Sequence, residues 1–349
     1  MKSIGIEIKK NKLINFAIIL CISFGYIIFH FRDLNLNEAA KNLRQIEVSW
    51  LLLGMGIMCI YWFLEALVLC KMSNKTQTRQ SLWKSIQITM IGQFFNTITP
   101  FSSGGQPAQL FMMVKNGISI GVGSSVLLMK FIVFQAMLVF SSIIVLLFGH
   151  EYLQSNTIPQ LNTLILVGFG LNTLVIITLI SIAKSKRVAF FIARSILKPV
   201  SFFIKRERYL KWKEKLDQKL VSFHEESNRM SFDLKLLFQC SVLTLVQLWL
   251  FFSIPYFVIH GLGIANINFF QVIAFHAFIM MFSSLVPIPG GSGGAEYSFS
   301  LLFGLILQPT ILILCLIFWR FITYYSCIIF GSFFLFVAGK KQRKKSTIS

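Results

Sequence analysis

Long apolar segments alternate with short charged ones along this chain, and six of the apolar segments run unbroken for about the length that crosses a bilayer. In hydrocarbon the backbone must satisfy its own hydrogen bonds, so segments of this kind fold as spanning helices. Charged residues make up only 13% of the chain, against roughly 25% in a soluble domain. We therefore expect an all-α polytopic membrane protein in which residues 1–349 form a single transmembrane domain. The six expected spans are Leu13–Phe31, Ser49–Cys70, Ser119–Gly149, Ile158–Ala183, Leu234–Ile259 and Thr310–Ala338.

Two further apolar stretches, about residues 86–114 and 267–307, are interrupted by Pro and Gly. The interruptions are Thr99–Gln109 (TPFSSGGQPAQ) and Pro287–Glu296 (PIPGGSGGAE), and neither contains Lys or Arg. Broken helices persist in a membrane only where protein or a watery cavity satisfies the freed backbone groups. Paired interruptions in the two halves of a polytopic protein point to a substrate site. The breaks therefore favour a transporter.

The basic residues gather between the apolar segments, which is the positive-inside pattern of membrane proteins. We therefore attribute the net charge of +20 to basic loops that orient the protein in the membrane and attract anionic lipid. No nucleic-acid partner is expected. The pattern predicts a multi-pass cell-membrane protein with both termini in the cytoplasm. It also predicts a cytoplasmic basic and amphipathic connecting arm at residues 184–230 and a basic cytoplasmic tail at residues 339–349. These assignments agree only if each broken stretch enters and leaves on one side, which predicts two re-entrant hairpins of opposite orientation.

The two breaks also match each other locally. Aligned at Pro100 and Pro287, both have Gly four residues later and Ala eight residues later, and Gln109 and Glu296 occupy the next position. The match is short, so an inverted repeat and a chance similarity are both open.

The connecting arm begins with residues 187–198, which mix aromatic and aliphatic side chains with cations. This composition resembles an interfacial helix lying under anionic headgroups. A solvated arm and a specific lipid or partner site are both open interpretations.

Glycine and proline at the breaks point to backbone chemistry. Gly lets a ligand approach the backbone closely, and a helix that restarts after a break directs free N–H groups and a positive dipole end into the membrane. This arrangement suits a phosphate or a carboxylate, and a packing kink without a ligand is the alternative. The expected residues are Pro100, Gly104, Gly105, Pro287, Pro289, Gly290 and Gly291.

Ionisable residues inside apolar segments are costly unless they are paired, so each is a candidate for function. Lys130 and Arg320 lie 11 and 10 residues into their segments, near the expected middle of the membrane. We expect them to offset headgroup charge, and Glu296 to pair with one of them or with an aminoacyl amine. Internal ion pairs such as Lys130–Glu296 are the alternative. Glu65 and His276 are further candidates.

Polar side chains lead into the first break. Gln93, Asn96 and Thr97 fall at i, i+3 and i+4 and so share one helix face. Together with Thr99 they can line a cavity or cap the broken backbone. Gln109 follows the break at the position that matches Glu296.

Motifs of enzymes and metal sites are not found in the sequence. It contains no P-loop, dinucleotide-binding, zinc-protease or serine-hydrolase pattern, so no catalytic residue is assigned. The six cysteines form no C-x-x-C motif, and the five histidines have no ligand spacing. No metal and no cofactor are therefore expected.

The segments Gln93–Pro107 and Pro287–Glu296 resemble the membrane region of lysylphosphatidylglycerol synthases, also called multiple peptide resistance factors. The resemblance extends over nearly the whole chain. It implies a flippase-like membrane half that moves an aminoacylated or other anionic phospholipid between leaflets of a bacterial plasma membrane and so contributes to resistance against cationic antimicrobial peptides.

The chain departs from that family at two places. Full-length members carry a cytoplasmic domain that transfers lysine from its tRNA to phosphatidylglycerol, whereas only Gly339–Ser349 follow the last apolar segment here. We therefore expect the transferase activity to be absent from this chain. Many members also have Arg near the position of Gln109, which leaves lysyl-phosphatidylglycerol open as the substrate.

Three functions are therefore carried forward. The leading hypothesis is a lipid flippase whose partner is a membrane phospholipid. The alternatives are a membrane partner of a separately encoded lipid-modifying enzyme, such as a lysyltransferase or glycosyltransferase, and a transporter of small solutes. Assembly into a homo-oligomer is compatible with each.

Overall fold

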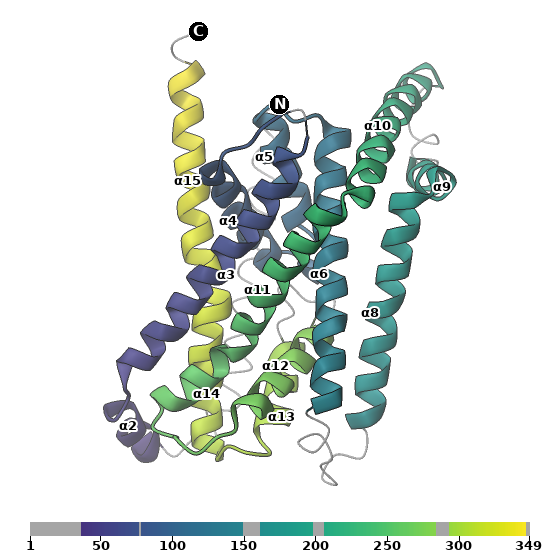
Figure 1. The fold of residues 1–349 in the computed structure, drawn as a ribbon. Helices are drawn as coiled ribbons and strands as arrows, with labels where there is room; N and C mark the ends of the chain where they lie inside the picture. Colours follow the sequence, from purple (N-terminus) through teal and green to yellow (C-terminus); the bar gives the residue numbers. More distant parts are fainter. Residues whose placement is uncertain (1–35, 77, 149–160, 198–205, 284–292, 347–349) are drawn as a thin grey trace.

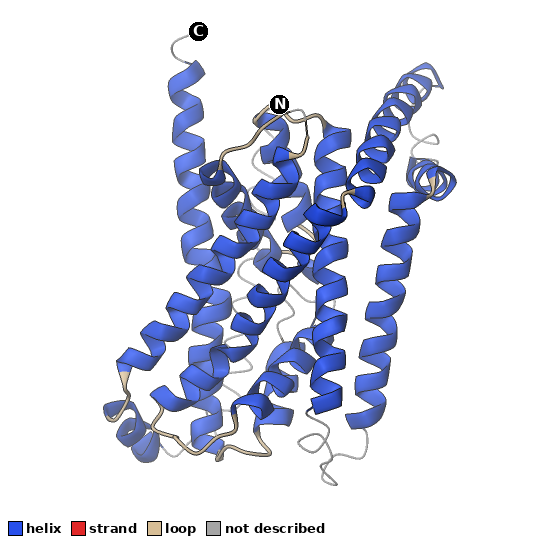
Figure 2. Cartoon of the chain, viewed as in Figure 1, coloured by secondary structure: helices blue, strands red, loops and turns tan. Residues whose placement is uncertain are grey.

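The computed structural model describes residues 36–76, 78–148, 161–197, 206–283 and 293–346. In this part of the chain every regular element is a helix, and no strand is present (Figure 2). The helices stand side by side as an elongated bundle (Figure 1). In chain order they are α2 (Leu36–Arg44), α3 (Val48–Asn74), α4 (Leu82–Ile98), η1 (Pro100–Ser102), α5 (Gly105–Lys115), α6 (Ile120–Phe148), α8 (Leu161–Lys184), α9 (Lys186–Leu197), α10 (Arg206–Phe232), α11 (Leu234–Gly261), α12 (Phe269–Ser283), α13 (Gly294–Phe303), α14 (Pro309–Arg320), η4 (Phe321–Tyr325) and α15 (Ser326–Ser346).

Five helical segments of the described residues are long and apolar enough to cross a membrane. Each coincides with one of the expected spans to within a few residues, apart from the third, whose qualifying window starts later. The first expected span, Leu13–Phe31, lies outside the described residues. The five segments are Val48–Asn74, Ile120–Phe148, Val167–Lys184, Leu234–Gly261 and Pro309–Ala338. The last combines α14, the π-helix η4 and α15.

Large aromatic side chains fill the centre of the bundle. Phe252 of α11, Phe275 of α12 and Phe299 of α13 are fully buried in one apolar cluster. Other large apolar side chains lie on the outside, for example Phe148, Phe238 and Phe336. Such side chains are stable on the surface of a protein whose surroundings are hydrocarbon. The burial pattern therefore agrees with a membrane protein whose core and exterior are both apolar.

The first break separates α4 from α5, which folds back and packs against it. The backbone is left-handed at Phe101 (φ 53°) and Ser102 (φ 50°), a conformation that costs a non-glycine residue energy. Polar side chains at and just after the end of α4 bind the backbone at the start of the next helix and so hold this reversal. Asn96 and Thr99 accept hydrogen bonds from the N–H groups of Gly105 (3.0 Å) and Gly104 (2.8 Å).

The second break separates α12 from α13, which also pack against each other. Residues 284–292 are outside the described part, and with them the expected site residues Pro287, Pro289, Gly290 and Gly291. Gly293 precedes α13 with φ 82°, a conformation that suits glycine. In Figure 1 the pair α4–α5 lies in the upper half of the bundle, and α12–α13 lies in the lower half.

A surface ion pair joins α3 to the start of α11. Nζ of Lys75 lies 2.8 Å from Oδ2 of Asp233, which also caps α11 by accepting a hydrogen bond from the N–H of Leu236. The Lys75 hydrogen bond, and then the N–H of Leu236, hold the pKa of Asp233 below the ordinary 3.8. A lowered carboxyl pKa stabilises the fold above the unfolded-state pKa, and the contribution is lost as the pH falls through the folded-state pKa.

Replacing Asp233 by Asn should therefore lower the melting temperature at pH 7, although Asn still caps the helix. The difference from wild type should shrink as the pH falls below 3.8, where the carboxylate is protonated first in the unfolded state, and vanish once the pH is below the lowered pKa of the folded state. Thermal unfolding in detergent at pH 7 and at stepwise lower pH measures this. A gap that stays constant with pH would assign the effect to the cap rather than to the charge.

Candidate functional site

Four helices each contribute one polar side chain to a cluster inside the bundle. Nζ of Lys130 (α6) lies 2.6 Å from Oε1 of Glu65 (α3). Gln93 (α4) donates from Nε2 to the other carboxylate oxygen at 2.5 Å, and Gln109 (α5) accepts from Lys130 at 3.4 Å. We call Glu65, Gln93, Gln109 and Lys130 the Lys130 cluster. Its two charged side chains keep small exposed fractions, 14% for Lys130 and 10% for Glu65.

The two charges of the Lys130 cluster compensate each other inside the bundle. A buried ion is tolerated when an opposite charge and further hydrogen bonds replace its water. Glu65 receives both, since each carboxylate oxygen has its own donor. Gln93 contacts this ion pair, its role in lining a cavity or capping the break stays a prediction, and Glu65 is the partner of Lys130.

Gly92 makes room for Gln109 in this cluster, a role that the sequence analysis missed. A Cβ atom at residue 92 would overlap the side chain of Gln109. The glycine therefore lets the α5 side chain lie directly on the backbone of α4. The sequence feature that could have indicated this role is a glycine directly before a polar residue, Gln93, in an otherwise apolar helix.

Changing Gly92 to Ala should push Gln109 away from Lys130 and destabilise the protein by about 1–3 kcal/mol, the usual cost of overpacking. Gly56→Ala in α3 is the matched control, because a Cβ there meets no atom within 4 Å. It should be neutral or slightly stabilising. Denaturant unfolding measures both, and Gln109→Ala should relieve the Gly92→Ala variant. Equal effects of the two glycine changes would show that Gly92 has no such role.

A second charged pair lies deeper, between α13 and α14. A terminal nitrogen of Arg320 lies 2.7 Å from Oε2 of Glu296, and these side chains are only 6% and 2% exposed. Glu296 also accepts a hydrogen bond from the N–H of Gly293 and so caps α13. The guanidinium carbon lies 4.8 Å from the ring centre of Trp319 and 5.2 Å from that of Tyr324. We call Gly293, Glu296, Trp319, Arg320 and Tyr324 the Arg320 cluster.

The backbone changes character directly after Arg320. The five residues Phe321–Tyr325 form a π-helix, a local irregularity that is frequent at functional sites. Nε of Arg320 is buried and has no hydrogen-bond partner in the described part of the chain. The Arg320 cluster thus retains a donor that a ligand or water can use.

Tyr324 links the two clusters through α4. Its hydroxyl donates to the carbonyl oxygen of Thr97 at 3.0 Å. Thr97 lies one turn after Gln93 on the same face of α4, as the sequence spacing predicts. Polar groups therefore follow one another from the Lys130 cluster, along α4, to the Arg320 cluster, and we call this arrangement the polar path.

In both clusters, a residue that directly follows a helix break contacts a cation inside the bundle. Gln109 and Glu296 occupy matching positions after the aligned prolines, and each contacts a cation on the following long helix, Lys130 on α6 and Arg320 on α14. The suggested pair Lys130–Glu296 is wrong, because Lys130 binds Glu65 and Glu296 binds Arg320. Internal pairing itself, the alternative for these residues, is found at both cations.

Gly104 and Gly105 do not offer free backbone donors. Their N–H groups are used by Thr99 and Asn96, so the expectation of an open anion site at these two glycines is corrected. The capping interpretation of Asn96 and Thr99 is confirmed. Pro100 starts the short helix η1 that forms the turn.

His276 supports the Arg320 cluster from behind. Its Nε2 accepts a hydrogen bond from the indole N–H of Trp319 at 3.1 Å, and its Nδ1 lies 3.2 Å from the carbonyl oxygen of Phe252. An accepting Nε2 means that Nδ1 carries the proton, which is the neutral tautomer. His276 therefore positions Trp319.

Among the described residues, no group of three or more His, Cys, Asp or Glu side chains could hold a metal ion. The chemistry available along the polar path is that of paired charges and hydrogen bonds, which can bind a charged ligand.

Comparison with known proteins agrees with the resemblance noted in the sequence. A family model described as "Lysylphosphatidylglycerol synthase TM region" matches residues 13–331, a range that contains both breaks and both clusters. The chain is also similar to a UPF0104 membrane protein of Archaeoglobus fulgidus, with 27% identity over 320 residues that cover 90% of this chain and 94% of that protein. The protein therefore belongs to the family of the lysylphosphatidylglycerol synthase transmembrane region.

Proposed function

We propose that this membrane protein binds the charged headgroup of a phospholipid along the polar path and moves the lipid between leaflets. The observation that carries the proposal is the continuity of the path. Two ion pairs inside the bundle, one beside each helix break, are joined through Gln93, Thr97 and Tyr324. Ionisable groups inside a membrane bundle are costly and typically mark substrate pathways.

The charges of the path suit a phospholipid headgroup. A phosphate can replace Glu65 as the partner of Lys130, and an amine on the headgroup can approach the released carboxylate. Exchange of one ion pair for another keeps every charge compensated, which avoids the desolvation cost of a lone buried ion. The exposed fractions favour the Lys130 cluster as the entry point, because its pair is the more exposed of the two.

The topology proposed with this function has two re-entrant hairpins, α4–α5 and α12–α13, of opposite orientation. Their positions in opposite halves of the bundle support it (Figure 1). So do Gln109 and Glu296, which contact equivalent cations after each break. An inverted repeat is the arrangement that many transporters use to alternate access between the two sides.

We also propose a cell-membrane location with the N- and C-termini in the cytoplasm. The basic helices α9 and α10 and the end of α15 lie at the same end of the bundle (Figure 1). Concentration of Lys and Arg at one end marks the cytoplasmic side.

A lipid-exchange assay tests the function. The purified chain is reconstituted in liposomes with fluorescent phosphatidylglycerol, lysyl-phosphatidylglycerol or polyprenyl phosphate, and leaflet exchange is followed. The double variant Lys130→Ala, Arg320→Ala should lose exchange. Lys71→Ala is the control, because Lys71 lies in the last turn of α3 and binds the neutral Gln239 at 3.1 Å.

The possible results separate the candidate functions. Exchange of one lipid that the double variant loses and Lys71→Ala keeps would support the flippase. Normal exchange by the double variant would reject the polar path. No lipid exchange, with uptake of a soluble substrate, would favour a solute transporter. No transport, with co-purification of a lipid-modifying enzyme, would favour the partner-subunit function.

A further inference from the structure

A basic groove lies outside the bundle, between the two helices of the connecting arm. α8 ends at Lys184, and α9 begins at Lys186. α9 runs across the end of α8 and is covered by α10 (Figure 1). Because α8 is one of the segments that can cross a membrane, a helix that turns sideways at its end lies at the level of the membrane surface.

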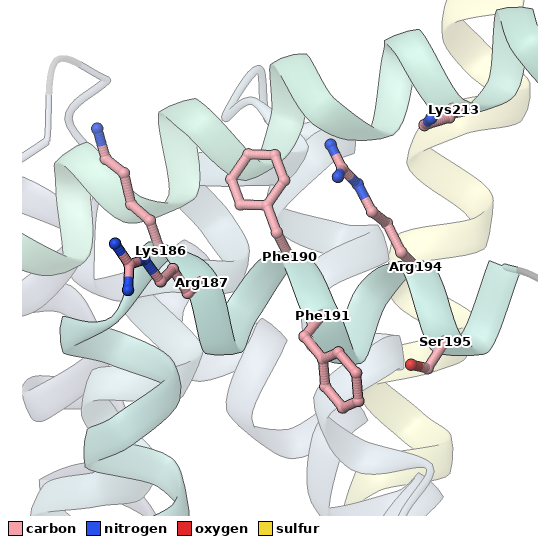
Figure 3. Close-up of a pocket in the computed structure, with 7 residues that line it drawn as sticks. All are labelled: Lys186, Arg187, Phe190, Phe191, Arg194, Ser195 and Lys213. Atoms are coloured by element: carbon pink, nitrogen blue, oxygen red, sulfur yellow. The ribbon is translucent and has the colours of Figure 1, made fainter.

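The groove has a volume of about 710 Å³ and carries four cations. Lys186, Arg187 and Arg194 come from α9, and Lys213 comes from α10 (Figure 3). Arg194 pairs with Asp217 at 3.0 Å, and the other three cations make no ion pair with a described residue. A concave surface with several unpaired cations attracts an anion that carries more than one charge or that several of the cations can contact at once.

Aromatic residues give the same helix an apolar side. Phe190 points toward α10 (Figure 3), and the guanidinium carbon of Arg194 lies 5.2 Å from the centre of its ring. Phe191 points away from α10, and 72% of its surface is exposed (Figure 3). Cations on one side and an exposed aromatic ring on the other are typical of a helix that lies in the headgroup region of a membrane.

An apolar hollow of about 290 Å³ adjoins the arm on the bundle side of α9. It is formed between α6, α8, α9 and α10, and its lining includes Ile120, Ile182, Ile192 and Leu216. A free phosphate ion gains nothing by contacting such an apolar surface, whereas an acyl chain is stabilised when it is buried against it. The apolar surfaces beside the groove therefore favour a phospholipid over a soluble anion.

We propose that the groove between α9 and α10 binds the headgroup of an anionic phospholipid in the leaflet at which α8 ends. Lys186, Arg187, Arg194 and Lys213 hold the phosphate, and Phe191 and the adjoining hollow contact the acyl chains. This site is separate from the polar path, so it anchors the arm to anionic membrane whether or not the lipid is transported.

Binding to the full-length protein in zwitterionic detergent tests the proposal. The probe is phosphatidylglycerol, with phosphatidylcholine and inorganic phosphate as separate arms, and bound lipid is counted by native mass spectrometry. The test variant changes all four groove cations to Gln. The matched control changes four exposed cations that do not line the groove, Arg79, Lys84, Lys215 and Lys235, to Gln.

The groove variant should bind phosphatidylglycerol roughly tenfold or more weakly, since each basic residue near an anionic surface contributes to the attraction. The matched control should bind like wild type, and phosphatidylcholine should bind weakly throughout. Asp217→Asn should bind phosphatidylglycerol more tightly, because Arg194 loses its competing partner. A gain of binding is a result that misfolding cannot produce.

Three results would overturn the proposal. They are equal losses in the groove variant and its control, equal binding of phosphatidylcholine, and complete displacement of the lipid by inorganic phosphate. Lipid exchange in liposomes, measured in parallel, should be unchanged in the groove variant. Failure of the exchange function would leave this binding result intact, so the two proposals can fail separately.

Discussion

Replacing Arg320 by Met is expected to destabilise the protein by about 3–5 kcal/mol, the cost of leaving one partner of a buried ion pair uncompensated. Glu296 would keep only the N–H of Gly293 as a hydrogen-bond donor among the described contacts. Its side chain is 2% exposed, so water cannot replace the guanidinium. Denaturant unfolding in detergent, read by circular dichroism, measures the loss.

The double variant Arg320→Met, Glu296→Met is the control. Replacing both charges by apolar groups of similar size is often neutral or stabilising, but the capping of Gly293 by Glu296 is lost here. We therefore expect the double variant to recover most of the stability, short of about 1 kcal/mol for the cap. It should not recover lipid exchange. A loss below about 1 kcal/mol in the single variant would show that Glu296 is protonated or hydrated instead.

The positions of the helices could be predicted because spanning segments must be long and apolar. The described spans begin and end near the expected limits, as α3 and α11 illustrate. Capping by Asn96 and Thr99 was also accessible, because short polar side chains before a break bind the nearest free N–H groups. These features depend on local sequence and on the solvent, not on which helices become neighbours.

The pairing of charges could not be predicted, because it depends on helix packing. Lys130 and Glu65 are 65 residues apart, and only the packing of α3 against α6 brings them together. The sequence showed the cost of each charge but not the identity of its partner. Tyr324 was missed for the same reason, since its acceptor is the carbonyl oxygen of Thr97 in a helix far away in the chain.

The Lys130 and Arg320 clusters differ in a way that matters for transport. Both contain a cation, a carboxylate and a residue that follows a helix break, but only the Lys130 cluster uses a neutral Gln at that last position. Gln109 therefore leaves Lys130 less strongly held on that side than a carboxylate would. Under the proposed function, the Lys130 cluster is accordingly the place where a headgroup phosphate competes, and the Arg320 cluster is the more buried of the two.

Replacing Lys130 by Ala should lower the rate of lipid exchange roughly tenfold or more, because a charge-assisted hydrogen bond to the headgroup contributes about 1.5–3 kcal/mol. Its effect on stability should be smaller than that of Arg320→Met. Glu65 keeps the hydrogen bond from Gln93, and its 10% exposure lets water approach. Exchange in liposomes and unfolding in detergent measure the two effects, with Lys71→Ala as the control for removal of a lysine.

Exchanging the two charges separates binding from structure. The variant Glu65→Lys, Lys130→Glu keeps an ion pair between α3 and α6, so its stability should return to within about 1 kcal/mol of wild type. The cation then lies on α3, away from Gln109 and the first break, so exchange should stay low. Recovery of exchange together with stability would mean that the pair only holds the helices together. Recovery of stability alone would assign Lys130 to the path of the lipid headgroup.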